Sequence, residues 1–278
     1  MTTITARRQT AQGARRQSYV VADAITMLRR NLLHIVRYPG LTMFVIGAPV
    51  VFLLLFVFVF GGTLGAGLPG VDLAGGREAY VAYVMPGILA MTIAGTAGGA
   101  ATTVAMDMTE GITARFRTMA ISRAAVLAGH VLGNTVQAML GIVVVLGVGL
   151  LIGFRSTTGP IQWVAAVGMI VLLAFAISWL AVAMGMQSKS VETASNLPTL
   201  LILLPFLGSG FVPTDSMPVW LQWFAEYQPF TPFVETLRGL LLGTDLGWNP
   251  VLAIGWCAVI TVGGYAWSMA IYERKSVR

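Results

Sequence analysis

The sequence predicts an all-α integral membrane protein with six transmembrane helices. Hydrophobic residues make up 56% of the 278 residues and charged residues only 10%, whereas a soluble domain usually carries about 25% charged residues. The 32 glycines and 12 prolines agree with the higher frequency of both residues in transmembrane helices. Several apolar runs also reach the ~20 residues that a helix needs to cross ~30 Å of hydrocarbon.

Six apolar runs are separated by polar or Pro- and Gly-containing connections. The predicted spans are residues 41–60, 81–106, 131–154, 161–187, 196–212 and 251–272. The fifth is the shortest and contains Pro198 and Pro205. Because proline removes a helix hydrogen bond and clashes with the preceding turn, we expect this span to be kinked or broken.

The chain before the first span divides into two parts. Residues 1–17 are polar, basic and of low complexity, so we expect them to be disordered. In residues 18–38 the apolar side chains recur at helical spacing and the arginines fall largely on other faces. This pattern is typical of an amphipathic helix lying in the membrane interface. We therefore expect one transmembrane domain, residues 18–278, that begins with an interfacial helix. Because Arg29-Arg30 interrupts the N-terminal region, we expect no cleaved signal peptide.

The distribution of basic residues predicts the orientation. If the N-terminus is cytoplasmic, the inner segments hold fourteen of the 17 Lys and Arg residues, and the outer segments hold only Arg77, Arg155 and Arg238. Inner loops of membrane proteins carry this excess of positive charge. Both termini are therefore expected in the cytoplasm, with the chain crossing the cell membrane several times.

The outer connection of residues 213–250 is too apolar for a solvated loop. Its aromatic side chains alternate with prolines, and Trp and Tyr commonly anchor a segment at the membrane interface. We expect two short re-entrant helices that dip into the outer leaflet before the last span. The candidate residues of this outer gate are Pro213, Pro218, Trp220, Trp223, Phe230 and Arg238.

The inner connection of residues 107–134 combines charged and apolar side chains beside the membrane. We expect a short cytoplasmic helix that a soluble partner could push, with carboxylates near its start that complement its dipole. The candidate contact residues are Asp107, Glu110, Arg115, Phe116, Arg117, Met119 and Arg123, with a lesser contact at Lys189 and Glu192 in the next inner connection. The alternatives are a plain basic loop that only sets topology and, for the second connection, a solvated turn.

Several classes of function are disfavoured. No predicted span carries a charged residue well inside it, which argues against ion-coupled transport. The phosphate-binding pattern GxxxxGK[ST] is absent, so energy for active transport must come from another polypeptide. One cysteine and two histidines make a metal site improbable and exclude an internal disulfide. The net charge of +6 does not indicate nucleic-acid binding, because the arginines lie beside membrane spans.

A membrane enzyme is the remaining class to weigh. Gly208-Ser209-Gly210 is the strongest candidate for a nucleophile, but a serine nucleophile needs a general base beside it. The last histidine in the chain is His130, which lies at the opposite side of the membrane in the predicted topology. We expect no enzymatic activity in this chain.

Three stretches are specific in combination. They are the inner segment EGITARFRTMAISRAAVLAGHVLGN, the Pro86-Gly87-Ile88 of the second span, and the run from Asn196-Leu197-Pro198 through PFLGSGFVPTDSMPVWLQWFAEYQPFTPFVETLRGLL. Together they resemble the permease subunit of ABC-2 type ATP-binding-cassette exporters of the daunorubicin- and doxorubicin-resistance kind. The resemblance covers nearly the whole chain from residue 18. Gln228-Pro229 departs from the Asn-Pro pair that many relatives carry.

The resemblance implies a half-transporter. Two copies of the permease would pair with two nucleotide-binding ATPase subunits, which would hold the ATP and magnesium, so that this chain itself needs no cofactor. The coupling helix would transmit ATP binding to a cavity between the permeases. The implied cargo is a hydrophobic or amphipathic drug or a lipid, and the implied location is the bacterial cell membrane.

A substrate path could be lined by polar side chains inside the spans. The candidates are Thr92, Thr96, Thr102, Thr103 and Gln137. Hydrogen bonds from these threonines to their own helix backbone are the alternative. Export of an envelope lipid or polyketide-lipid remains an alternative function within the same family, and a passive channel or membrane scaffold remains one outside it.

Overall fold

The computed structural model describes residues 39–65, 76–109 and 123–274, and this part of the chain is helical with no β-strand. The elements are α2 (Pro39–Leu55), the π-helix η1 (Phe56–Phe60), α3 (Gly61–Gly65), α4 (Gly76–Thr109), α6 (Arg123–Leu151), α7 (Pro160–Gln187), α8 (Val191–Asn196), α9 (Thr199–Leu203), the 3₁₀-helix η2 (Thr214–Ser216), α10 (Val219–Tyr227), α11 (Phe230–Leu242) and α12 (Asn249–Arg274). The predicted disordered N-terminus and interfacial helix lie outside the described residues.

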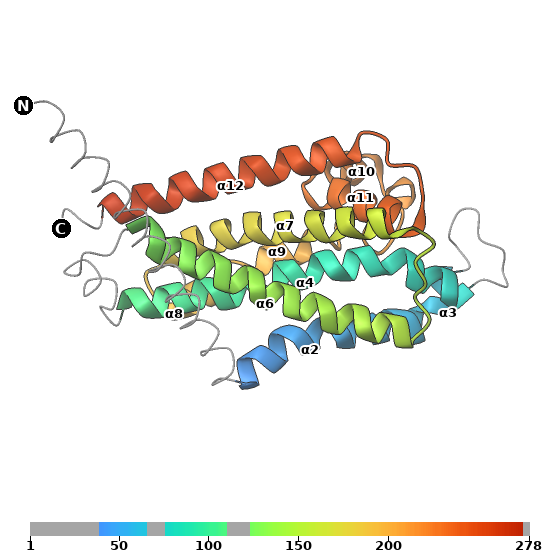
Figure 1. Cartoon of the computed structure of the whole chain (residues 1–278), viewed down its shortest axis with the longest axis horizontal. Helices are drawn as coiled ribbons and strands as arrows, with labels where there is room; N and C mark the ends of the chain where they lie inside the picture. Colours follow the sequence, from blue (N-terminus) through green and yellow to red (C-terminus); the bar gives the residue numbers. More distant parts are fainter. Residues whose placement is uncertain (1–38, 66–75, 110–122, 275–278) are drawn as a thin grey trace, which may run out of the picture.

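The long helices run side by side as one bundle around α4 and α7 (Figure 1). Within the most apolar stretch of α4, 78% of the residues are buried, compared with 22% in α12 and 22% in the span that includes α2. α12 packs along α7, and α2 packs against α4 and α6. The outward surfaces of α2 and α12 are apolar, which suits contact with lipid.

Small residues allow the central helices to approach closely. A Cβ atom on Gly185 of α7 would overlap the backbone of Ala101 in α4, and one on Gly264 of α12 would meet the backbone of Trp179 and Leu180 in α7. Glycine at such positions is a common way for membrane helices to reach backbone contact. The core therefore depends on glycine positions as well as on apolar volume.

Within the described residues, five helices are long and apolar enough to cross a membrane, one fewer than the six spans that the sequence predicts. Four predicted spans correspond to α4, α6, α7 and α12, and the first corresponds to α2 with η1 and α3. The predicted fifth span is not one helix. It consists of α8, α9 and a run of turns from Leu204 to Phe211, because Pro198 and Pro205 interrupt the helix.

The broken fifth stretch runs antiparallel to α4. Ser195, in α8, lies beside Gly98, whereas Gly210 lies against Gly87, nearer the beginning of α4. α8 accordingly lies at the end of the bundle where α4 finishes, and α10 and α11 lie at the other end (Figure 1). These are called the α8 end and the α10 end below.

Candidate functional site

Polar side chains gather at three levels of the bundle, beginning with a histidine–carboxylate pair at the α8 end. His130 Nε2 in α6 lies 3.2 Å from Asp107 Oδ2 in α4, and each side chain is only 8% exposed. Asp107 was expected near the start of a short helix, but it belongs to the last turns of α4. A carboxylate is unfavourable there because it faces the negative end of the helix dipole. The pairing with His130 offsets this cost and ties α4 to α6.

The remaining predicted contact residues divide between two places. Glu110, Arg115, Phe116, Arg117 and Met119 lie outside the described residues, and Arg123 is the first residue of α6. Lys189 and Glu192 are both exposed, close to the start of α8. Ser190 caps this helix, since its Oγ accepts a hydrogen bond of 3.1 Å from the Thr193 N–H, and Glu192 in the first turn complements the helix dipole.

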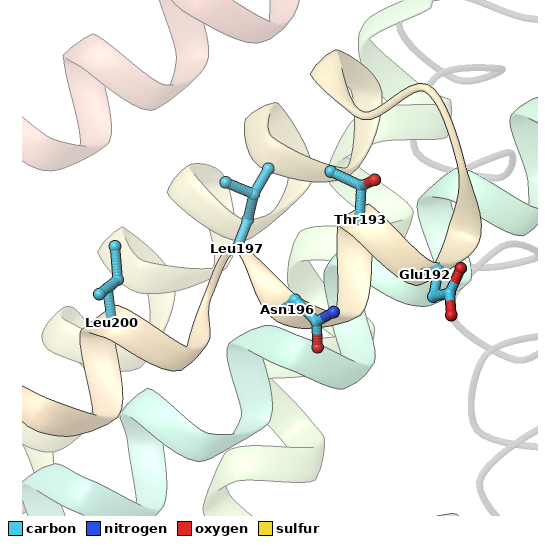
Figure 2. Close-up of a pocket in the computed structure, with 5 residues that line it drawn as sticks. All are labelled: Glu192, Thr193, Asn196, Leu197 and Leu200. Atoms are coloured by element: carbon cyan, nitrogen blue, oxygen red, sulfur yellow. The ribbon is translucent and has the colours of Figure 1, made fainter.

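An open hollow of about 360 Å³ lies along α8 and α9. Thr193, Leu197 and Leu200 project from the same side of this ribbon (Figure 2). The hollow is lined by Glu192, Thr193, Asn196, Leu197 and Leu200. It therefore combines polar side chains at the α8 end with exposed leucines toward the middle of the bundle.

A second polar group lies inside the bundle, where α4, α6 and α7 meet. Asn134 Nδ2 donates hydrogen bonds to Ser178 Oγ at 2.9 Å and to Thr96 Oγ1 at 3.4 Å. Both hydroxyls donate their own hydrogen to a backbone carbonyl of their own helix, so they are available as acceptors. Asn134 therefore links three helices through uncharged groups. Its Oδ1 has no hydrogen-bond partner within the described parts of the chain.

The predicted path threonines bond to the backbone of their own helix. Each of the four threonines donates to the backbone of α4 at 2.7–2.9 Å, which is the alternative expected from their position in a helix. Thr92 and Thr96 are buried, as is Gln137, and Thr102 and Thr103 are partly buried. Only Thr96 among these four threonines also accepts a described bond from another helix.

The third polar group lies at the α10 end and is centred on Arg238. This side chain is 7% exposed, and its Nη2 donates to Ser209 O at 2.8 Å and to Tyr83 O at 3.2 Å. Its guanidinium lies 4.0 Å from the centre of the Tyr83 ring. Nη1 is paired with the carboxylate of Glu235, one turn earlier in α11. One cation from α11 thus contacts both α4 and the broken stretch.

Residues 204–211, called the turn segment below, do not form a regular helix. Side chains from neighbouring elements donate hydrogen bonds to their backbone carbonyls. Ser209 O also accepts from the Tyr83 hydroxyl at 3.1 Å, and Phe211 O accepts from the Tyr80 hydroxyl at 3.4 Å. On the α11 side, Gln228 Nε2 donates to Leu204 O at 2.9 Å. Because unpaired backbone groups are costly in lipid, these bonds make a broken helix tolerable inside the bundle.

Aromatic packing covers the same segment on its α2 side. The rings of Phe206 and Phe211 are stacked with their centres 4.4 Å apart. The ring centre of Phe56, in the π-helix, lies 4.7 Å from that of Phe211. A π-helical turn widens the helix locally and is frequent at functional sites. Here the π-helix begins at Phe56, whose ring contacts the turn segment.

α11 is itself fixed at its C-terminus by the connection between α6 and α7. Ser156 Oγ donates to Leu241 O at 2.7 Å, and Thr158 Oγ1 donates to Leu240 O at 2.7 Å. These hydroxyls satisfy carbonyls that the helix end leaves without partners. The helix then stops at Gly243, which has a left-handed φ of 76°. Arg238 therefore projects from a firmly held element.

The predicted outer-gate residues do not form one group. Arg238 and Phe230 are buried in the bundle, whereas Trp220 and Trp223 in α10 are 75% and 68% exposed. Pro213 and Pro218 precede η2 and α10, where they act as helix starts. Tyr83, Glu235 and the Asn134–Ser178 bond were not predicted from the sequence, whereas Ser209 was considered only as a nucleophile and Gln228 only as a departure from the family pattern. Glu235 was detectable as a carboxylate three residues before an arginine, but the others had no comparable signal.

Comparison with known proteins agrees with the helical architecture. Residues 22–242 match the family described as ABC-2 type transporter. The chain is 26% identical over 258 residues to the daunorubicin resistance ABC transporter permease protein DrrB1 of Streptomyces coeruleorubidus, covering 92% of this chain and 88% of that protein. It is 27% identical over 194 residues to the probable doxorubicin resistance ABC transporter permease protein DrrC of Mycobacterium tuberculosis, covering 67% of this chain and 70% of that protein.

The family match extends from before α2 to the end of α11, so it includes the Asp107–His130 pair, the Asn134 group and the Arg238 group. The bundle of long apolar helices is the architecture that a membrane transporter subunit requires. The chain belongs to the ABC-2 type transporter family.

Proposed function

We propose that this chain is the membrane-spanning subunit of an exporter that moves hydrophobic or amphipathic molecules out of the cell, with ATP hydrolysed by a separate subunit. The observation that carries the proposal is the family match over residues 22–242. The relatives named as drug-resistance permeases support export as the direction and lipophilic compounds as the cargo.

The proposed topology has six crossings, with α8, α9 and the turn segment together forming the fifth. The stretch of α4 between Tyr80 and Gly98, along which this segment runs, spans about 27 Å at 1.5 Å per residue, close to the hydrocarbon thickness. The α8 end is then cytoplasmic and the α10 end faces outward, in agreement with the basic residues near the N-terminus and C-terminus.

The proposed cargo follows from the charges of the bundle. Among the described residues, the buried acidic and basic side chains of the bundle lie at its two ends, as Asp107 with His130 and as Arg238 with the partly buried Glu235. Between them the buried polar groups are hydroxyls and the amides of Asn134 and Gln137. Uncharged surroundings favour a lipophilic molecule over an ion, because a desolvated charge would have no partner there.

The proposed energy source is a nucleotide-binding ATPase that contacts the inner connection between α4 and α6. The Asp107–His130 pair supports this location, since it joins the two helices from which that connection leaves. A displacement of the connection would act on both helices together. We further propose that two permeases and two ATPase subunits form the complex, so that the path lies between two copies.

The test is gentle purification of the tagged chain from native membranes, followed by mass spectrometry and an ATPase assay. We expect a soluble subunit with a phosphate-binding loop at equimolar amount, and ATPase activity that rises with lipophilic drugs. Arg117→Glu should abolish this stimulation while leaving membrane insertion unchanged. Stimulation by envelope lipids but not by drugs would replace the drug by a lipid as the cargo.

A chain that purifies only with itself, under conditions that keep related complexes intact, would contradict the proposal and favour a channel or scaffold. Normal partner binding and transport in the Arg117→Glu variant would remove the coupling role from the inner connection without affecting the rest of the proposal.

A further inference from the structure

The Arg238 group joins the turn segment to two different helices, α11 and α4. Ser209 O accepts hydrogen bonds both from Arg238 in α11 and from Tyr83 in α4. Arg238 also donates to the backbone carbonyl of Tyr83 itself. Loss of this single side chain would therefore remove described bonds to the turn segment and to α4 together.

The charge of Arg238 is neutralised locally. Glu235 is its ion-pair partner and lies on the same helix, so the pair can remain together if the turn segment moves away. Tyr83 adds a cation–π contact from α4, of the kind that gains strength when desolvated. The Arg238–Glu235 pair lies entirely on α11. A movement of α4 or of the turn segment would break only the contacts that Arg238 makes to Tyr83 and Ser209.

The group is also incompletely satisfied. Arg238 Nε, Ser209 Oγ and Gln228 Oε1 are buried and have no hydrogen-bond partner in the portion of the chain that the structure describes. Buried polar atoms without partners cost free energy, and a partly satisfied network is less stable than a complete one. Water entering from the α10 end would supply the missing partners. A hydrated arrangement would therefore satisfy atoms that the observed packing leaves without partners.

We propose that Arg238 and Glu235 form an outer latch, which holds the turn segment against α4 and must release it for the path to open outward. This inference rests on the proposed function, in which the α10 end faces the outside. Arg238 acts as a positioning residue: it binds no cargo, and its removal favours the open arrangement. Ser156 and Thr158 hold α11 as the support from which the latch acts.

Accessibility of a cysteine at Ser209 tests the latch directly. The Ser209 hydroxyl makes no described hydrogen bond, so Ser209→Cys leaves the backbone contacts in place, and Cys257→Ser removes the only native cysteine. The labelling rate is measured in intact cells with a membrane-impermeant thiosulfonate. We expect slow labelling in this background and an increase of about tenfold or more in Arg238→Gln and Glu235→Gln. The first variant removes the bonds to Ser209 O and Tyr83 O, and the second leaves the Arg238 charge without its carboxylate partner, which favours the hydrated arrangement.

Matched variants control for charge and for location. Arg155→Gln removes an exposed arginine at the same end, whose described hydrogen bonds go to Leu150 O at the end of α6 and to Phe154 O beside it. Glu226→Gln removes an exposed carboxylate of α10. Neither should change the labelling rate. Ser216→Cys, at an exposed site, should label fast in every background. Arg238→Lys keeps the charge but lacks the planar fork and should label at an intermediate rate.

Folding is checked by yield and monodispersity in detergent. If Arg238→Gln does not fold, the double variant Arg238→Gln/Glu235→Gln leaves no unpaired charge and provides the same readout. Fast labelling of Ser209→Cys in the parent background, or equal labelling in folded variants with and without the pair, would overturn the latch.

Measuring the labelling rate with and without ATP distinguishes failure of the latch from failure of the proposed function. In membranes with the partner ATPase, ATP should increase the Ser209→Cys labelling rate in the parent background. Labelling that depends on Arg238 and Glu235 but not on ATP would support the latch and contradict the ATP-driven cycle. Labelling that depends on ATP but not on this pair would support the cycle and overturn the latch.

Discussion

His130 Nε2 in α6 lies 3.2 Å from Asp107 Oδ2 in α4, with both side chains buried at the end of the bundle where the two helices are joined. The Arg238 group contacts α4 at Tyr83, near the beginning of the helix, whereas Asp107 lies in its last turns. The two ends of α4 are therefore each fixed to a neighbouring element by a buried charged group.

Replacement of His130 by Leu should destabilise the protein by about 3 kcal/mol, because it leaves the Asp107 carboxylate buried without this partner. The double variant His130→Leu/Asp107→Asn removes the charge as well and should recover about half of that loss. Thermal unfolding in detergent measures both effects. The exposed carboxylate variant Glu226→Gln should be neutral, and purely additive effects of the two substitutions would contradict a paired role.

Asn134→Leu should lower the free energy of unfolding by about 1–2 kcal/mol, because it removes described hydrogen bonds from α6 to α7 and α4. Ser178→Ala removes the partner of the shorter bond, so the two substitutions should be less than additive. Thr102→Val is the matched control, since Thr102 bonds only Gly98 O of its own helix in the described contacts. A Thr102→Val effect as large as that of Asn134→Leu would contradict this account.

Much of the helical fold could be predicted because long apolar runs have few stable forms in a membrane. The predicted span of residues 161–187 differs from α7 by one residue. The break in the fifth span follows from Pro198 and Pro205. The sequence could not place the end of α4, since Asp107 was assigned to a separate helix on the basis of its charge alone, whereas the helix continues to Thr109.

The site was less predictable because its contacts join distant parts of the chain. Arg238 stands out in the sequence as a charge within an apolar stretch, and Glu235 precedes it by one turn. The Tyr83–Ser209 bond, however, links residues 126 positions apart, and no local pattern reports such a contact. The threonines of α4 were chosen for polarity alone, which does not distinguish a side chain that bonds its own backbone from one that faces a path.

The cap on α11 should be measurable residue by residue. Ser156→Ala and Thr158→Val each remove a hydrogen bond to a helix-end carbonyl and should cost about 1 kcal/mol. Hydrogen exchange at the C-terminal turn of α11 should accelerate in both variants. Ser216→Ala is the control, because the Ser216 hydroxyl bonds only Pro213 O, within its own turn, among the contacts that the structure describes. Unchanged exchange in both cap variants would show that the connection between α6 and α7 does not hold α11.

The contact between Gly87 and Gly210 gives a sharper test of how the turn segment sits on α4. A Cβ atom on Gly87 would overlap the backbone of Gly210, which cannot turn aside as a side chain could. Gly87→Ala should therefore destabilise the protein by about 1–3 kcal/mol and increase the labelling rate of Ser209→Cys, because separation at Gly210 also pulls Ser209 from Tyr83. Gly95→Ala, on the same helix with open space around it, should be neutral or stabilising by up to about 1 kcal/mol through its helix propensity. Equal stability of the two alanine variants would mean that the turn segment does not rest on α4 as described here.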